Sequence, residues 1–132
     1  MAPMTRSRAG ADAVPSVLAI DYYASRADAG LLITEGTGTS EMAMGYARTP
    51  GIYNDAQIAA WSKITEAVHA KGGRIFVQLM HVGRIAHSAN RNIADPPVAP
   101  SAIRAAGQMW TDAKGMQPND IPRALATEEI PN

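Results

Sequence analysis

Three polar side chains in the sequence are candidates for ligand binding or acid/base chemistry. Gln78 interrupts an otherwise apolar run over 75–80, and an unpaired buried amide costs about 1–3 kcal/mol, so something polar should meet it. The polar partner of the Gln78 amide could equally well be a neighbouring backbone group or a ligand. His81 follows this run and could be a ligand or an acid/base group, although a hydrogen-bonded loop histidine is the commonest case. Tyr46 could face a substrate, but a surface aromatic that anchors its loop is the commoner case.

Other patterns exclude several kinds of chemistry. The sequence has no cysteine, so thiolate catalysis, disulfides and cysteine-ligated metals are excluded, which suits a cytoplasmic protein. No dinucleotide-binding, phosphate-loop or zinc-protease fingerprint occurs, and no metal site is predicted. His87 and Asn90 have an H-x-x-N spacing that we interpret as coincidence, because no strand precedes them. The methionines are interpreted as gap fillers or loop contacts rather than redox groups.

Composition narrows the choice of partners. The 132 residues are 46% hydrophobic, enough for a packed core, and 12 basic residues balance 12 acidic ones. Without a net positive charge, neither nucleic acid nor an anionic membrane is an expected partner. Residues 1–6 have no apolar segment, and no apolar run approaches the ~20 residues that cross a bilayer. We expect neither export nor membrane insertion.

Short apolar runs alternate with longer periodic segments, which indicates an α/β fold. Pro15 opens a first helix that is expected to end near Ala29, with Gly30 as its C-terminal cap. Residues 31–34 are apolar without alternation, as in a parallel strand covered on both faces. The small polar stretch 35–39 is interpreted as a loop, at the strand end where such folds carry function.

A second helix and strand follow. Asn54 can cap the helix, and Gln57 can reach back to the cap in a capping box. Gly72 and Gly73 end the helix, and 75–80 form the next strand. The polar turn after this strand lies where α/β enzymes place chemistry. The predicted apolar face of the helix comprises Ile58, Trp61, Thr65 and Val68.

The remaining sequence loses this periodicity. Six of the nine prolines lie from Pro96 onward, and 85–126 are predicted to be a long, irregular loop region. Residues 127–131 resemble the beginning of a helix, with Thr127 as its cap and acids in its first turn.

Several segments together resemble the Old Yellow Enzyme family of FMN-dependent NAD(P)H oxidoreductases, which includes alkene reductases and 12-oxophytodienoate reductases. They follow the family's order and spacing over essentially the whole chain. The segments are 2–6 (APMTR), Tyr22-Tyr23 with Arg26-Ala27, 30–37 (GLLITEGT), 45–47 (GYA), 49–53 (TPGIY), 73–84 (GRIFVQLMHVGR) and 122–125 (PRAL).

The resemblance implies part of a TIM (β/α)8 barrel with FMN at the carboxyl ends of the strands. Pro3 and Met4 would contact the flavin through their backbone, and the Thr5 hydroxyl would lie beside the flavin C4 carbonyl. Gly36 would let the backbone approach the ring, and the Gln78 amide would pair with the pyrimidine edge.

The implied reaction transfers hydride from NADH or NADPH to FMN, and then from the reduced flavin to an activated alkene such as an enone. Tyr46 matches a substrate-pocket tyrosine, and Met80 falls where many relatives have tryptophan. The family's His/Asn pair for the enone oxygen and its proton-donor tyrosine have no counterparts here. His87 and Asn90 lie too early in the chain for that pair, so no catalytic residue is assigned.

A complete barrel takes about 250 residues. Residues 1–132 are therefore expected to be one incomplete domain, roughly the first three strands and two helices plus the long loop. Exposed barrel edges would favour self-association, and the chain alone is expected to be inactive. The alternative is a non-catalytic remnant or an interaction module that pairs with a complementary chain. A complete flavodoxin-like domain is disfavoured, because no phosphate loop follows the first strand.

Overall fold

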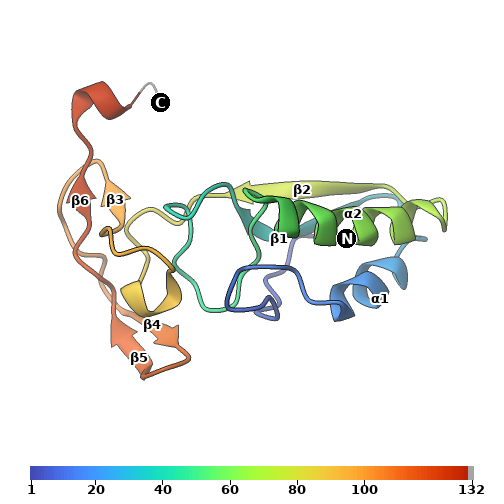
Figure 1. The fold of residues 1–132 in the computed structure, drawn as a ribbon, viewed down its shortest axis with the longest axis horizontal. Helices are drawn as coiled ribbons and strands as arrows, with labels where there is room; N and C mark the ends of the chain where they lie inside the picture. Colours follow the sequence, from blue (N-terminus) through green and yellow to red (C-terminus); the bar gives the residue numbers. More distant parts are fainter. Residues whose placement is uncertain (131–132) are drawn as a thin grey trace. The chain divides into compact units, whose positions relative to one another are not determined.

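The computed structural model describes residues 1–130, shown in Figure 1. The chain divides into two compact units, which are described separately. The first unit comprises Met1–Ser40 and Arg48–Met80, and the second comprises Glu41–Ala47 and the chain from His81 onward. Within residues 1–130, no helix combines the length and the hydrophobicity that a membrane crossing requires.

The first unit contains a parallel pair of strands and two helices that pack against each other (Figure 1). The polar stretch that the sequence suggested as a loop continues β1 as far as Gly38, so that interpretation is wrong. The partner strand supplies the reason, because Gly36, Thr37 and Gly38 are in register with it. The elements are α1 (Leu18–Ala24), β1 (Leu32–Gly38), α2 (Asp55–His69) and β2 (Ile75–Met80).

Aromatic and aliphatic side chains of α1, α2 and β1 form the core of this unit. Tyr23 and Leu32 are fully buried, and the Tyr23 and Trp61 rings lie 6.1 Å apart. Strand β2 is different, since Phe76 and Leu79, which point to opposite faces of the strand, are 66% and 61% exposed. The buried core cluster comprises Tyr23, Ala27, Leu32, Trp61, Ile64 and Val68.

Helix α1 is shorter than the predicted span from Pro15 to Ala29. From Arg26 onward the backbone bonds run from residue i to residue i−3, as from Ala29 N–H to Arg26 O at 3.0 Å. Such bonds form tight turns rather than α-helix. Of the periodic apolar positions in this segment, Val17 is 78% exposed, whereas Ala24 and Ala27 are buried and Ile20 packs against the core.

Helix α2 begins at the predicted cap but does not form the predicted capping box. The Asn54 side chain accepts a 3.0 Å hydrogen bond from Gln57 N–H. The Gln57 side chain accepts from Tyr53 N–H and donates to Asp12 O, instead of bonding to Asn54. The predicted helix face is wrong in part, because Ile58 is 48% exposed. The buried positions are Gln57, Trp61, Ile64 and Val68.

The second unit contains short strands within 85–126, where the sequence predicts irregular structure. Two of them form an antiparallel hairpin, and two others pair in parallel. The helix expected from Thr127 is a single 3-10 turn, and residue 131 lies outside the described residues. The elements are η1 (Ser88–Asn90), β3 (Val98–Ala99), β4 (Gln108–Thr111), β5 (Gly115–Pro118), β6 (Arg123–Ala124) and η2 (Thr127–Glu129).

Candidate functional site

The carboxyl ends of β1 and β2 bring two of the candidate residues together. The strands are parallel, and Gly36 lies opposite Gln78 in the register, followed by Gly38 opposite Met80. Between Ile33 and Gly36 the register shifts, because three steps along β1 match two steps along β2. This is a β-bulge, a feature that re-aims side chains beside functional sites.

Side-chain hydroxyls replace the backbone bonds that the bulge removes. Thr34 Oγ1 accepts a 3.0 Å bond from Gln78 N–H and donates a 2.9 Å bond to Glu35 O. Thr37 Oγ1 donates to the same carbonyl at 2.9 Å. The fully buried Tyr23 hydroxyl accepts the Glu35 N–H at 2.9 Å. The distorted strand is therefore held in one conformation.

The Gln78 side chain is exposed at this edge, as are those of Phe76, Val77 and Leu79 on the same strand. Its backbone N–H is satisfied by Thr34, and no hydrogen bond to its side-chain amide is found within residues 1–130. Of the two explanations open from the sequence, the bond to a neighbouring backbone group is therefore not observed. The amide offers two donors and an acceptor to a ligand.

Gly36 is buried beneath the Met80 side chain. A Cβ added at Gly36 would lie 2.6 Å from Met80 Sδ and 3.0 Å from its Cε, closer than any ordinary contact. A side chain at position 36 would therefore displace Met80. The backbone at Gly36 is thus covered by the flexible thioether of Met80.

The amino-terminal segment runs beside β1 in the first unit. Met1 bonds through its N-terminal amine to Leu31 O, and Met1 O accepts from Ile33 N–H at 3.1 Å. Further along, Arg6 N–H donates to the Glu35 carboxylate at 3.0 Å. The three candidate residues between these anchors, Pro3, Met4 and Thr5, are all exposed.

Glu35 is buried, with 6% of its surface exposed, and it lies at the centre of this arrangement. Burial raises the pKa of the Glu35 carboxyl, and the N–H groups of Arg6 and Ser7 and the charge of Arg6 oppose that rise. Burial likewise raises the pKa of Tyr23 to about 12, so this phenol stays protonated and accepts the Glu35 N–H as a neutral group.

Tyr46 belongs to the second unit and is 39% exposed. The candidate residues of the first unit are Pro3, Met4, Thr5, Gly36, Gln78 and Met80, and of these the structure shows Gly36 beside Gln78 and Met80. Glycine again allows close packing beside this tyrosine, because a Cβ at Gly45 would lie 2.6 Å from the Ala86 Cβ.

The histidines of the second unit have structural partners. His81 Nδ1 accepts from Gly83 N–H at 3.0 Å, and burial, helped by the charge of Arg91, lowers the pKa of His81. His87 Nδ1 accepts from Ala89 N–H at 3.0 Å. The Asn90 amide donates to the carbonyls of Gly45 and Trp110. These bonds fit the interpretation of the H-x-x-N spacing as coincidence. No cluster of three potential metal ligands occurs within residues 1–130.

Sequence reasoning missed Thr34 and Glu35, which shape the site without being predicted to touch a ligand. The missed signal is a run of polar residues, Thr34, Glu35 and Thr37, directly after an apolar strand. Polar residues that continue a buried strand must find partners inside the protein, whereas a loop would leave them in water.

Comparison with known proteins places the chain in a family. All residues, 1–132, match the model of the NADH:flavin oxidoreductase / NADH oxidase family, and the chain belongs to that family. The resemblance to the Old Yellow Enzyme family, whose members are flavin-dependent oxidoreductases, is thereby confirmed.

Among the curated relatives, the chain is 61% identical to chanoclavine-I aldehyde reductase of Penicillium roqueforti, over 98% of this chain and 34% of that protein. It is 43% identical to 12-oxophytodienoate reductase 7 of Oryza sativa subsp. japonica, over 99% of this chain and 34% of that protein. The chain thus spans about a third of the length of these relatives.

Solved structures agree with this assignment. An Old Yellow Enzyme homologue from Zymomonas mobilis superposes with a TM-score of 0.93 at 50% identity, covering 99% of this chain and 36% of that one. Morphinone reductase in complex with tetrahydroNAD superposes with a TM-score of 0.89 at 51% identity, covering 99% and 37%. The fold is therefore part of a TIM barrel, as expected.

The residues at the strand ends fit the flavin that this family uses. A planar ring needs a close approach to the backbone, and Gly36 carries no side chain of its own, but the Met80 side chain covers it and would have to move aside. The ring also needs polar groups at its pyrimidine edge, which the exposed Gln78 amide offers. The exposed backbone of 3–5 and the Thr5 hydroxyl add further polar groups in the same unit.

Proposed function

We propose that this chain forms part of the FMN site of an NAD(P)H-dependent ene-reductase. The observation that carries the proposal is the exposed Gln78 side chain, which lies opposite Gly36 at the carboxyl ends of two parallel strands. Ligands of α/β folds bind at this end of the sheet. Membership of the flavin oxidoreductase family supports the same conclusion.

In this proposal Pro3 and Met4 bind the flavin through their backbone, and Thr5 donates its hydroxyl to the flavin C4 carbonyl. The Gln78 amide pairs with the pyrimidine edge, and Gly36 leaves room for the ring. When bound, FMN would supply the hydride chemistry, taking hydride from the nicotinamide and giving it to the substrate. The residues named here bind and orient the ring, and none is proposed as the proton donor.

The proposed substrate is an activated alkene such as an enone, with NADH or NADPH as the reductant and the cytoplasm as the compartment. Tyr46 and Met80 are the proposed substrate-side residues. Relatives whose names describe 12-oxophytodienoate reduction and flavin mononucleotide-dependent alkene reduction support this class of reaction. Met80 lies over Gly36, so its thioether is positioned to shape the space above the flavin.

FMN titration of the purified chain tests the flavin site. We expect the chain to quench flavin fluorescence, and Gln78→Leu to weaken that binding roughly tenfold through the loss of the amide's hydrogen bonds. Gln108→Leu is the matched control, since Gln108 is an exposed strand glutamine of the second unit. Equal FMN affinity in the two variants would contradict the role of Gln78.

A chimera tests the reaction. Residues 1–130 replace the matching segment of the Zymomonas mobilis homologue, which superposes with a TM-score of 0.93. We expect the chimera to bind FMN and, with oxygen excluded, to consume more than one equivalent of NADH or NADPH per flavin only when an enone such as 2-cyclohexenone is present to reoxidise the flavin. A folded chimera that binds FMN but leaves the enone unreduced would contradict the proposed activity.

Exposed apolar side chains on β2 favour a second candidate, a non-catalytic module that pairs with a complementary chain. Val77 and Leu79 on one face of the strand are 40% and 61% exposed, Phe76 on the other face is 66% exposed, and exposed apolar patches mark interaction surfaces. Self-association in size-exclusion chromatography without FMN binding would favour this candidate over the enzyme.

A further inference from the structure

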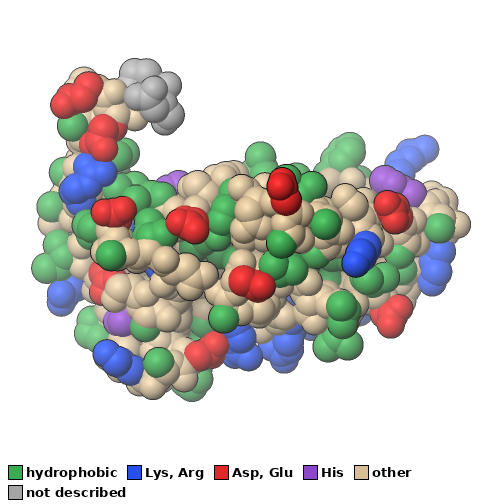
Figure 2. Space-filling view, viewed as in Figure 1, with side chains coloured by type: hydrophobic (Ala, Val, Ile, Leu, Met, Phe, Trp, Pro, Cys, Tyr) green, Lys and Arg blue, Asp and Glu red, His purple; other side chains and the backbone are tan. Residues whose placement is uncertain are grey.

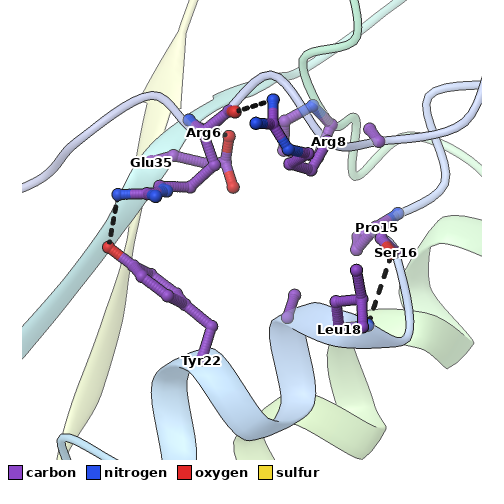
Figure 3. A pocket seen from close by; sticks show the side chains of 10 residues that line it. Arg6, Arg8, Pro15, Ser16, Leu18, Tyr22 and Glu35 are labelled. Carbon is purple, nitrogen blue, oxygen red and sulfur yellow. Dashed lines mark hydrogen bonds between the residues drawn. The ribbon is translucent and has the colours of Figure 1, made fainter.

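The hydrogen bonds around Glu35 carry an inference that rests on the proposed FMN site. Glu35 lies on β1 immediately before Gly36, and its buried carboxylate does not reach the proposed ligand side. It bonds to the amino-terminal chain instead, accepting from Arg6 N–H at 3.0 Å. Figure 3 shows the Glu35 carboxylate directed toward the backbone of Arg6.

The backbone on the other side of this contact makes a tight turn. Ser7 adopts a φ of 50°, in the left-handed region, directly after the Arg6 N–H that binds the carboxylate. A hydrogen bond from a backbone N–H to an ionised carboxylate is stronger than one between neutral groups. Glu35 supplies that carboxylate from within the same chain.

The Arg6 side chain fixes the same turn through contacts with Tyr22. Its Nη1 donates to the Tyr22 hydroxyl at 3.1 Å, and its guanidinium carbon lies 4.5 Å from the centre of the Tyr22 ring. The guanidinium of Arg26 also lies near that ring, at 4.1 Å. Figure 3 shows Arg6 extended over the pocket toward Tyr22 on α1.

These contacts fix the chain on both sides of residues 2–5 but not within them. Met1 pairs with β1 at one end, and Arg6 is fixed to Glu35 at the other, while Ala2, Pro3, Met4 and Thr5 are all exposed. Thr5 is one residue from the Glu35 anchor. Loss of that anchor would free the Thr5 hydroxyl before it disturbed the buried core.

We propose that Glu35 is a positioning residue for the flavin site, which holds Thr5 in place by binding the backbone N–H of Arg6. Glu35 touches neither flavin nor substrate in this proposal. It couples the amino-terminal segment to the β1 bulge, where its own N–H and C=O are fixed by Tyr23, Thr34 and Thr37. The amino-terminal segment and strand β2, which carries Gln78, are thereby both bonded to β1.

The first arm of the test needs no flavin. Amide hydrogen exchange at Arg6 and Ser7 is measured in the wild-type chain, in Glu35→Gln and in Glu66→Gln. The control removes the same charge from an exposed position of α2 in the same unit. We expect roughly tenfold faster exchange at Arg6 in Glu35→Gln and none of this change in the control. Unchanged exchange at Arg6 in a folded Glu35→Gln chain would overturn the proposal.

The second arm measures FMN affinity in a double-mutant cycle with Thr5→Ala. We expect Glu35→Gln to weaken FMN binding roughly tenfold and to weaken it little further when Thr5 is already alanine, because Glu35 acts through Thr5. Additive effects would overturn the proposal, since a general loss of structure weakens binding whatever residue stands at position 5. Glu35→Asp serves as a second variant if the glutamine variant does not fold.

The two arms separate this inference from the proposed function. A wild-type chain that binds FMN only as tightly as Glu35→Gln does would refute the positioning role and leave the flavin site standing. A wild-type chain that binds no FMN would refute the flavin site, and the positioning role with it. Faster exchange at Arg6 in Glu35→Gln, together with a loss of FMN affinity that is not additive with Thr5→Ala, supports both the flavin site and the positioning role.

Discussion

The Thr34 hydroxyl accepts the hydrogen bond of the Gln78 backbone N–H, at 3.0 Å, where a regular sheet would use a carbonyl. The bond joins the two strands at the bulge, where the register shifts. Beyond the bulge Gln78 lies opposite Gly36. The backbone of the candidate flavin ligand is thus held by a buried side chain of the neighbouring strand.

Thr34→Val should destabilise the first unit while keeping its shape. The substitution leaves Gln78 N–H without its acceptor, and we expect a loss of about 1–3 kcal/mol in the free energy of unfolding. Thr34→Ser is the control, because it keeps the hydroxyl. Urea unfolding gives the free energy, and amide exchange at Gln78 should rise in the valine variant but not in the serine variant. Equal exchange in both variants would show that the hydroxyl does not hold this register.

Tyr23→Phe should be costly although Tyr23 contacts no proposed ligand. It leaves the buried Glu35 N–H unpaired, so the free energy of unfolding should fall by about 1–3 kcal/mol. Tyr22→Phe, which loses only the half-buried bond to Arg6, should cost about 0.5 kcal/mol. Thermal or urea unfolding of the two variants compares them directly, and the reverse order would be inconsistent with the hydrogen bonding described here.

Gly36→Ala should affect flavin binding more than folding. The added Cβ meets the end of the flexible Met80 side chain, which can move, so the unfolding free energy should fall by only about 1 kcal/mol. FMN affinity should fall more, because Met80 is pushed into the space proposed for the ring. Gly30→Ala is the control, since a Cβ added there would meet no atom within 4 Å. FMN titration and urea unfolding of both variants measure the two effects. A Gly36→Ala chain with normal FMN affinity would exclude a close approach of the ring.

Stability should depend on pH through Glu35. Burial raises the pKa of the Glu35 carboxyl, so the folded chain holds this proton at pH values where the unfolded chain has lost it. The contribution of Glu35 to the free energy of unfolding is therefore largest below the pKa of the unfolded carboxyl. It falls as the pH rises through the folded pKa.

Urea unfolding between about pH 4 and about pH 8 measures this contribution as the difference between wild type and Glu35→Gln. The groups that face the carboxylate are Arg6, the Ser7 amide and Tyr23, and none of them is changed in the variant. We expect the wild type to lose stability relative to Glu35→Gln as the pH rises. A constant difference would mean that the Glu35 pKa is the same in the folded and unfolded chains.

Surface charge gives no further guide to ligands. On the face that Figure 2 presents, Lys and Arg side chains are interspersed with Asp and Glu, as the balanced composition suggests. Ligand recognition in this chain is thus argued from local groups, such as the Gln78 amide, rather than from a long-range field.

Local patterns in the sequence were enough to predict α2, its Asn54 cap and the strand over 75–80, because caps, glycine ends and apolar runs act over a few residues. The family resemblance, carried by ordered motifs from 2–6 to 122–125, was likewise readable without coordinates and is confirmed. Gln78 was noticed for the same reason, as a polar residue within an apolar strand.

Tertiary structure alone decided how β1 continues past Thr34 and why Gln78 is exposed. A bulge exists only relative to a partner strand, and the bonds of Thr34 to Gln78 and of Glu35 to Tyr23 and Arg6 join residues 12 to 44 positions apart. The Gln57 bond to Asp12 O spans 45 positions and redirects the predicted capping box. Such pairings depend on which segments meet in space, and no local pattern in the sequence encodes that.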